Sequence, residues 1–424
     1  MSSATAVKQA ASPLTFDVLK TAVSGSAAAF RCRRRFQPGG GEGDKVFPPT
    51  FAGAVYAVET RRVNGHEQPV TCVLLDSVQS QANRMEQALQ EALDAGEISL
   101  PLVTVDFSEY DPSNDTKKGK EGKEGYLLDA IGKVTSLQVP HRLADAILRD
   151  SEYNGEAFRK SATARTLNQA NPLNATPVYK LCPTALIFGM WDSTGPKGGL
   201  GAKFERAIVS EVVGFEAALS EFHKNRGVRH DPLEASKAVP ILRNEDGSWR
   251  VADDPKKKGV MRPSEINHGS VPFESDNAGI TIAYAEQITT LSMICLRRLR
   301  FPVEKPKPDQ NTANMTGHTV LAALGICAAT LAFESGMGLR SRCLLWSDGP
   351  MNWELLAKPG EPPKPFTLDA AGAKALFADA VAAAEKAGLE WQKEPLALKP
   401  SKELLKLVRL SQEQAVKEGS VEES

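Results

Sequence analysis

The first half of the chain contains hydrophobic patterns of two kinds, one typical of strands and one of helices. Arg31 to Phe36 runs into Gly39-Gly40-Gly41, which predicts a strand entering a glycine loop. From Val78 to about Leu93 the apolar residues share one stripe, which predicts a helix that ends at Gly96. In all, strands are predicted over residues 31–36, 54–59, 71–75 and 100–107.

The most informative segment lies between residues 178 and 213. The apolar run from Val178 to Met190 predicts a buried strand, residues 195–201 form a glycine-rich loop with Lys197, and a helix is predicted from about Ala202 to Val213. A glycine loop between a strand and a helix N-terminus can approach an anion closely. An ordinary flexible turn before a helix is the alternative.

The spacing of this loop excludes two phosphate-binding motifs. The loop of nucleotide hydrolases needs Gly-Lys followed by Ser or Thr, whereas Gly201 is followed by Ala202. The dinucleotide fingerprint needs a third glycine where Phe204 stands. The segment therefore indicates phosphate chemistry, most simply of RNA, without nucleotide hydrolysis.

Two polar segments interrupt the apolar pattern of the chain. Residues 108–125 and 223–277 are predicted to be insertions, and the apolar run 319–333 predicts a buried helix that is too short to span a bilayer comfortably. Residues 368 onward read as helix. Short strands interleaved with helices predict an α+β fold, with a core over residues 14–355 and a helical C-terminal extension over residues 356–424.

Composition narrows the function classes. The 424 residues carry a net charge of −1, so any nucleic-acid surface must come from locally segregated charge, as in the arginine run 31–35. Six scattered cysteines without a Cys-x-x-Cys pair, and no apolar signal segment, favour the reducing cytoplasm. No cofactor or metal site is assigned, because His230-Asp231 has no second ligand at usable spacing.

Three groups of side chains are candidates for binding a nucleic acid. Arg31, Arg33 and Arg35 share one face of their strand and can grip phosphates, although a charged edge strand is the alternative. The helix at Val78 exposes amides and Arg84, which suit sugar and phosphate oxygens unless the face is merely solvated. His141 and Arg142 fall in the first turn of a helix predicted from Pro140 to Arg149.

Catalytic chemistry has weak support in the sequence. Asp44, Asp76 and Asp192 are expected in loops near basic residues, where such an aspartate most often caps a turn or a helix. No paired carboxylates or nucleophile triad accompany them. No catalytic residue is therefore assigned, and the protein is not expected to be an enzyme.

Several segments together resemble one family. The chain resembles the CRISPR-associated RAMP protein of type I-G (formerly I-U) systems, the backbone subunit of that Cascade effector, strongly over residues 31–213 and loosely elsewhere. The segments that carry the resemblance are RFQP (35–38), GDKVFPPT (43–50), LLDSVQSQANR (74–84), TSLQVPHR (135–142), DAILRDS (145–151) and FGMWDSTG (188–195).

The resemblance implies a ferredoxin-like or RRM-like palm with inserted finger and thumb elements, and residues 108–125 and 223–277 both qualify as the thumb. Implied partners are CRISPR RNA, target DNA through guide pairing, copies of the chain and other Cascade subunits, with no membrane. Type I backbone subunits do not cut; a metal-dependent RNA-cleaving subunit, using Asp44, is the alternative. The expected RNA-binding residues are Arg31, Arg33, Arg35, Lys45, Gln79, Gln81, Asn83, Arg84, His141, Arg142, Lys197 and Lys203.

Overall fold

The computed structural model of the chain divides it into two compact units, which we describe separately. The larger unit comprises Met1–Asp106, Lys133–Ser220 and Gly279–Pro400, and the smaller one comprises Phe107–Gly132, Glu221–Ala278 and Ser401–Ser424. The structure describes residues 10–53, 55–108, 131–195, 197–198, 201–219, 228–229, 231–244, 248–255, 258–272 and 279–422.

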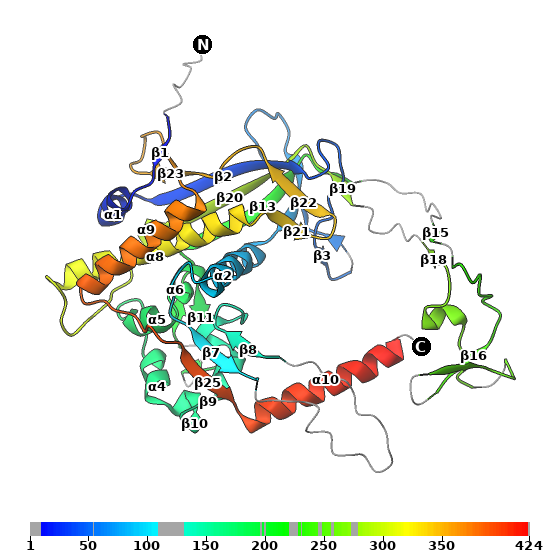
Figure 1. The fold of residues 1–424 in the computed structure, drawn as a ribbon. Coiled ribbons are helices and arrows are strands. Elements are labelled where there is room, and N and C mark those ends of the chain that lie inside the picture. Colours follow the sequence, from blue (N-terminus) through cyan, green and yellow to red (C-terminus); the bar gives the residue numbers. More distant parts are fainter. Residues whose placement is uncertain are drawn as a thin grey trace. The chain divides into compact units, whose positions relative to one another are not determined.

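A large sheet forms the centre of the larger unit (Figure 1). Its strand order is β1-β24-β23-β2-β20-β13-β6-β5; neighbours are antiparallel except β1 and β24. β22 continues the sheet along the end of β2, and β21 pairs with β22. The bounds are β1 Ser12–Pro13, β2 Ala29–Pro38, β5 Val58–Arg61, β6 Val70–Asp76, β13 Ile208–Phe215, β20 Tyr284–Ser292, β21 Met337–Arg340, β22 Cys343–Ser347, β23 Asn352–Leu356 and β24 Lys364–Thr367.

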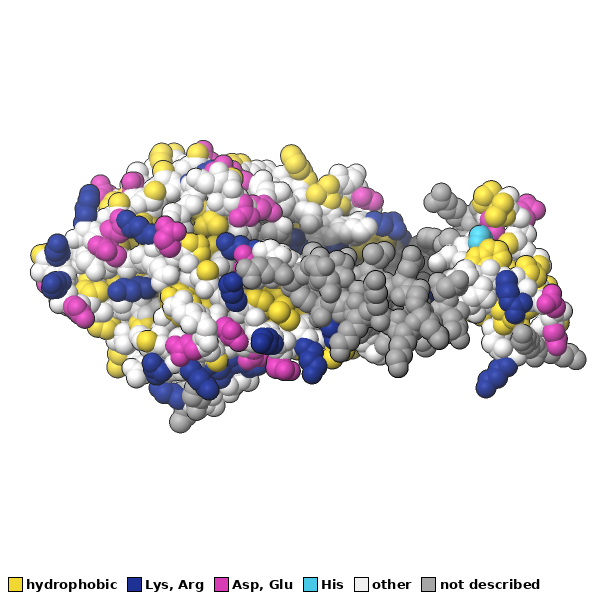
Figure 2. All heavy atoms as spheres, turned by 60° about the horizontal axis from the view of Figure 1, so that its bottom comes forward, with side chains coloured by type: hydrophobic (Ala, Val, Ile, Leu, Met, Phe, Trp, Pro, Cys, Tyr) yellow, Lys and Arg dark blue, Asp and Glu magenta, His cyan; other side chains and the backbone are white. Residues whose placement is uncertain are grey.

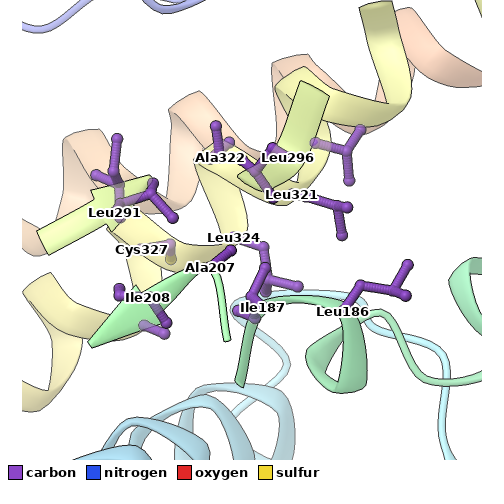
Figure 3. Packing of buried hydrophobic residues seen from close by; sticks show 14 of the residues in the cluster. Leu186, Ile187, Ala207, Ile208, Leu291, Leu296, Leu321, Ala322, Leu324 and Cys327 are labelled. Atoms are coloured by element: carbon purple, nitrogen blue, oxygen red, sulfur yellow. The ribbon is translucent and has the colours of Figure 1, made fainter. Parts of the chain in front are cut away.

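Helices cover one face of this sheet. α2 (Val78–Asp94) and α8 (Gln310–Glu334) contact each other and the central strands β13 and β20. α1 (Phe16–Ser24) and α9 (Ala370–Lys386) pack on α8, and α8 and α9 lie side by side in Figure 1. Figure 3 shows the sheet residues Ile208 and Leu291 beside Cys327 of α8. Alternate residues of each strand therefore face this core, and the residues between them face away.

Helix α8 has the length and composition of a membrane-spanning helix, but most of its apolar window is buried inside the protein. One of its two interior glycines, Gly317, permits close packing: a Cβ atom there would lie 2.6 Å from the ring of Phe301. The helix is apolar all round because it is enclosed on several sides. The prediction of a buried helix over residues 319–333 is confirmed.

A second sheet of the larger unit has the order β10-β9-β25-β7-β8, with β25 parallel to β7. Its strands are β7 Val103–Asp106, β8 Lys133–Thr135, β9 Ser151–Tyr153, β10 Glu156–Ala157 and β25 Leu396–Pro400. β25 interrupts the helix predicted from residue 368 onward. Leu396 and Leu398 are buried and alternate with exposed neighbours between Pro395 and Pro400, which is a strand pattern.

Short ladders complete the described chain. In the larger unit β3 (Thr50–Phe51) pairs with β4 (Val55–Tyr56), and β14 (Ala218–Leu219) pairs with β19 (Ile280–Thr281). In the smaller unit the pairs are β15 (Val228–Arg229) with β18 (Val271–Pro272) and β16 (Ile241–Arg243) with β17 (Trp249–Val251), followed by helix α10 (Lys402–Glu422). Apart from Ser108, the predicted insertion 108–125 lies outside the described residues, as do parts of 223–277.

The α+β class is confirmed by the mixture of helices and sheets, and so are the strands predicted at 31–36, 71–75 and 100–107 and the helix at 78–93. Two predictions around the glycine loop are wrong. The run 178–190 forms α5 (Thr176–Leu181) and α6 (Thr184–Phe188), and the segment after the loop forms β12 (Lys203–Phe204) and β13. The first error arises because the apolar run is buried on every side, and the second because the spacing of the apolar residues fits both a helix and a strand.

A run that is buried on every side carries no polar positions to reveal its period, so helix and strand look alike in sequence. Phe204, Ile208 and Val212 misled the prediction in a different way. Their spacing of four residues places them on one face of a helix and equally on one face of a strand. The β-branched residues between them decide for the strand.

Candidate nucleic-acid interface

The three predicted arginines of β2 lie on the sheet face that points away from the helices. Arg31 Nη2 is 2.7 Å from Glu354 Oε2, and Arg33 Nη2 is 2.8 Å from Glu286 Oε1. The guanidinium of Arg35 instead lies 4.2 Å above the ring centre of Tyr284. Two of the three cations are thus neutralised by carboxylates on neighbouring strands, which weakens this row as a phosphate clamp.

Aromatic side chains accompany Arg35 on this face. Tyr284 stacks on Phe215 with ring centres 5.1 Å apart and an interplanar angle of 8°. Trp346 of β22 pairs with Gln37 across the sheet and is 74% exposed. Residues paired directly across antiparallel strands share a face, so Trp346 lies on the Arg35 side of the sheet. No motif in the sequence around Trp346 or Tyr284 predicts that these aromatic side chains lie on the same sheet face as Arg35.

The polar residues of α2 divide into two groups. Gln79 and Asn83 are exposed, as predicted for a binding face. Gln81 is buried and donates to Asp76 Oδ2 at 2.6 Å, and its own carbonyl oxygen accepts from Ser210 and Gln287. The Gln81 side chain therefore lies in a closed network between the helix and the sheet.

Asp76 is the centre of a second polar cluster. It is fully buried and accepts hydrogen bonds from Ser80, Gln81, Arg84 and Arg340. Arg84 also donates to the carbonyl oxygen of Leu339 at 2.6 Å. The structure thus uses Asp76 and Arg84 to hold the start of α2 against β21, and the carboxylate has no open position toward solvent.

The glycine-rich loop closes a hairpin between β11 (Met190–Trp191) and β12 (Lys203–Phe204). Trp191 pairs directly with Lys203, whose Nζ lies 5.1 Å from the centre of the indole ring. Trp191 is 52% exposed, and Lys197 in the loop is exposed as well. The expected helix N-terminus after the loop is replaced by a strand, so no helix dipole acts there; Pro196, Gly199 and Leu200 lie outside the described residues.

Two arginines from neighbouring elements hold this loop. Arg149 of α3 (Ala146–Arg149) donates through Nη1 to Thr194 Oγ1 at 3.1 Å. Arg159 of the 3₁₀ turn η2 (Phe158–Lys160) donates through Nη1 to the carbonyl oxygen of Thr194 at 2.9 Å. Burial lowers the pKa of Arg159, and the neighbouring charge of Arg149 lowers it further. We call Arg149, Arg159, Trp191, Lys197 and Lys203 the hairpin cluster.

The helix predicted from Pro140 to Arg149 is broken in two. Arg142–Ala144 form a 3₁₀ turn, η1, and α3 begins after Asp145. Asp145 caps α3 by accepting from the Ile147 N–H, and its other oxygen accepts from the His141 N–H. His141 is exposed and directly precedes η1, so the prediction that it lies in the first turn of a longer helix is wrong.

Arg142 is buried inside the protein. Its Nε and Nη2 donate to the two carboxylate oxygens of Glu86, each at 2.7 Å, and Nη1 donates to the carbonyl oxygen of Gly189 at 3.0 Å. Burial raises the pKa of Glu86, although the charge of Arg142 opposes that shift. Arg142 has a φ of 51°, which is uncommon for a non-glycine residue. The pair connects α2 to the residue just before the hairpin.

The remaining predicted residues lie in the loop after β2. Asp44 is exposed, and its Oδ1 accepts the backbone N–H of Lys45 at 2.8 Å. Gly40 lies against the Asp44 carboxylate so closely that a Cβ atom there would overlap it. Within the described part of the chain, no three His, Cys, Asp or Glu side chains gather in a way that could hold a metal ion.

Comparison of the sequence with known protein families gives evidence about the function of the chain. Residues 30–219 match the family model of CRISPR-associated protein GSU0053. The match supports a CRISPR-associated protein. Its matched span includes β2, α2 and the whole hairpin cluster, whereas β20, α8 and Trp346 lie beyond it. No curated protein matches this CRISPR-associated chain.

Charge is mixed on the face of the protein that Figure 2 draws. Figure 2 shows Lys and Arg side chains interspersed with Asp and Glu on the face that it draws. This agrees with the near-balance of 51 basic and 52 acidic residues. A nucleic-acid interface in this protein therefore depends on local groups, such as the hairpin cluster, rather than on a large basic field.

Proposed function

We propose that this CRISPR-associated protein is a non-catalytic backbone subunit of a type I-G Cascade complex, which holds the guide RNA by its backbone. The family match over residues 30–219 supports the CRISPR system, and the resemblance of the sequence motifs supports the subunit. The observation that carries RNA binding is the exposed pairing of Trp191 with Lys203 in the hairpin cluster.

The topology of the large sheet supports an RRM-like palm. The four strands β2, β13, β20 and β23 follow one another in the chain in that order, and in the sheet they are arranged as β23-β2-β20-β13. α2 lies between the first and second of them, and α8 between the third and fourth. This is the arrangement of a split βαββαβ unit, with β5 and β6 inserted before α2.

The chemistry of the hairpin cluster fits a ligand whose sequence varies. An exposed indole ring can stack on any base, and flexible lysines attract phosphate at any register. Arg149 and Arg159 keep the loop in place. The charge of Arg149 is paired with Asp150, whose two carboxylate oxygens each accept from Arg149 at 2.7 Å, so Arg159 and the two lysines supply the positive charge. A guide RNA differs in sequence between complexes, so a clamp of this kind must recognise the backbone and the base faces only.

Assembly follows from the same proposal. Several copies bind successive stretches of one guide, other Cascade subunits join them, and target DNA is recognised by pairing with the guide. A surface of mixed charge, with a net charge of −1, suits contacts between identical copies. The complex is placed in the cytoplasm.

Binding of the full chain to single-stranded RNA and to duplex DNA across a salt series tests this function. A clamp on the RNA backbone gives a preference for RNA and a log-log slope of about −0.7 per phosphate contact. Lys203→Ala should reduce the slope, whereas Lys20→Ala, on the exposed side of α1, should leave it unchanged. A chain that binds no RNA at low salt, even when co-expressed with a CRISPR array, contradicts the proposal.

The non-catalytic part of the proposal has its own test. The assembled complex is incubated with Mg²⁺ and a radiolabelled RNA complementary to the guide, and the RNA should stay intact. Cleavage that disappears in Asp44→Ala would replace this proposal with the metal-dependent ribonuclease.

A further inference from the structure

A small, partly open cavity lies behind the hairpin cluster. It has room for about three water molecules, which is comparable to one six-membered ring. Its apolar walls include Leu143, Phe158, Leu167 and Met190. All the elements that line it belong to the larger unit, within residues 143–202.

The polar groups of the cavity are distributed unevenly. Arg149, Arg159 and Asn168 lie along its lining, and Asp192 supplies a carboxylate. The Arg149 guanidinium already donates to Asp150 and Thr194. Asp192 Oδ1 is enclosed and accepts no hydrogen bond from the residues that the structure describes; Arg159 Nη2 lies 3.8 Å from it. An enclosed acceptor without a donor is costly, and a ligand with an N–H group would relieve that cost.

The hairpin strands connect this cavity to the exposed Trp191. Met190 lines the cavity, whereas the next residue, Trp191, lies on the exposed side beside Lys203. Likewise Ala202 lines the cavity and Lys203 lies outside it. Successive residues of a strand point to opposite faces, so the hairpin separates an exposed stacking surface from a recessed one.

We propose that this cavity receives one unstacked nucleobase of the RNA strand that lies along the hairpin cluster; this inference rests on the proposed function. One base stacks on Trp191, and the neighbouring base enters between Phe158 and Met190. Its flat faces contact the apolar walls, and its amino or imino N–H group donates to Asp192. The adjoining phosphate lies near the guanidinium groups of Arg149 and Arg159.

The chemistry of the lining favours a nucleobase over other occupants. An aliphatic side chain would leave the Asp192 carboxylate without a hydrogen-bond donor. A bare inorganic anion would satisfy the arginines but would be repelled by Asp192. A nucleotide combines apolar faces, N–H donors and an anionic phosphate in one residue, and it therefore matches all three parts of the lining.

A substitution that fills the cavity tests the inference. Ala144 lines the cavity, and Ala144→Leu should occupy it; Ala146→Leu, two residues along and exposed, is the matched control. The full-length protein and both variants are titrated with single-stranded RNA and with an abasic ribose-phosphate oligomer of equal length. We expect Ala144→Leu to weaken RNA binding about tenfold, the loss of one stacked base, with no effect on the abasic oligomer. Ala146→Leu should behave as the unmodified chain.

Photo-crosslinking supplies a direct readout. RNA carrying 4-thiouridine should crosslink to the peptide that contains Phe158, and Ala144→Leu should abolish this crosslink while retaining crosslinks to the separate peptide that contains Trp191. If RNA binds but Ala144→Leu changes neither affinity nor crosslinks, the cavity is not a base site and only this inference fails. If no RNA binds at all, the proposed function fails together with it.

Discussion

Glu86 of α2 and Arg142 of η1 form a bidentate ion pair that is almost completely enclosed, with side chains 3% and 10% exposed. Arg142 also donates to the carbonyl oxygen of Gly189, which directly precedes the hairpin. The pair therefore couples α2, which packs on the large sheet, to the proposed RNA-binding surface. Breaking it is expected to affect stability first and binding through the hairpin second.

Replacing Arg142 by Ala should lower the free energy of unfolding by about 3 kcal/mol, because Glu86 would be left buried without its partner. Urea denaturation measures the change. Arg298→Ala is the control, since Arg298 pairs with Glu205 at the surface with both side chains more than half exposed. The control should cost less than about 1 kcal/mol; equal losses in both variants would contradict the structural role.

Asp76 and Asp44 should respond differently to the same substitution. Asp76→Asn removes the buried negative charge to which both Arg84 and Arg340 donate. The substitution should destabilise the protein by about 3 kcal/mol. Asp44→Asn, at an exposed loop position, should change stability by less than about 0.5 kcal/mol. Thermal unfolding of both variants under one buffer condition compares them; the reverse ranking would show that the Asp76 network is not structural.

Stability should fall on acidification partly because of His318. Burial lowers its pKa to about 4 from 6.5, and Nε2 lies 2.9 Å from the carbonyl oxygen of Leu299. The unfolded chain binds a proton at His318 below pH 6.5, whereas the folded chain does so only near pH 4. Stability is therefore present above pH 6.5 and is lost between pH 6.5 and 4, by at most about 3 kcal/mol.

His318→Gln removes this titration while keeping a side chain that can donate to Leu299. Unfolding free energies measured from pH 4.5 to 7 should have a smaller slope in the variant, by about one proton. His141→Gln is the control, because His141 is exposed. An unchanged slope in His318→Gln would contradict the assignment of this pH dependence to His318.

Two exposed tryptophans discriminate between the candidate surfaces for RNA. Trp191→Ala should weaken binding of single-stranded RNA about tenfold, by removing one stacked base. Trp346→Ala, on the open sheet face where Arg31 and Arg33 are paired with carboxylates, should change affinity less than about twofold. Fluorescence anisotropy at fixed salt measures both. A larger loss for Trp346→Ala would move the interface to the open sheet.

Gly317 tests the packing of α8. Gly317→Ala would place a Cβ atom 2.6 Å from the Phe301 ring, and it should destabilise the protein by about 2 kcal/mol. Gly338→Ala in β21 is the control, because the nearest atom to its Cβ is 3.9 Å away. Chemical denaturation of both variants compares them; a neutral Gly317→Ala would mean that the ring moves aside freely.

Sequence patterns were reliable where a local signal had one interpretation. β2 has a solvent-exposed side, and α2 has a clear cap in Ser77, which accepts from the Ser80 N–H. β6 is enclosed on both faces, but it is short and follows the turn signal Asn64-Gly65. The segment 178–213 was not predicted correctly, because an enclosed apolar run and a four-residue spacing are each compatible with helix and with strand. Tertiary burial decides such cases, and it is invisible in a window of sequence.

The candidate site shows the same division. Lys197 and Lys203 were found because glycines mark the loop between them. Gln81 and Arg142 were chosen for their chemistry, yet they are enclosed by Asp76 and Glu86, partners that no local pattern connects to them. Arg149 and Arg159 were not singled out as binding residues, since only the fold brings their separate short elements to Thr194.

The position of β2 in the sheet has a consequence for how the chain is made. Its neighbours β20 and β23 lie far along the sequence: the Arg33–Glu286 and Arg31–Glu354 contacts span 253 and 323 residues. During synthesis β2 leaves the ribosome early. Its edges remain unpaired until β20 and β23 have also been synthesised, which requires most of the chain. We therefore expect folding of the large sheet to be slow and largely post-translational, and a fragment ending at residue 219 to expose aggregation-prone strand edges.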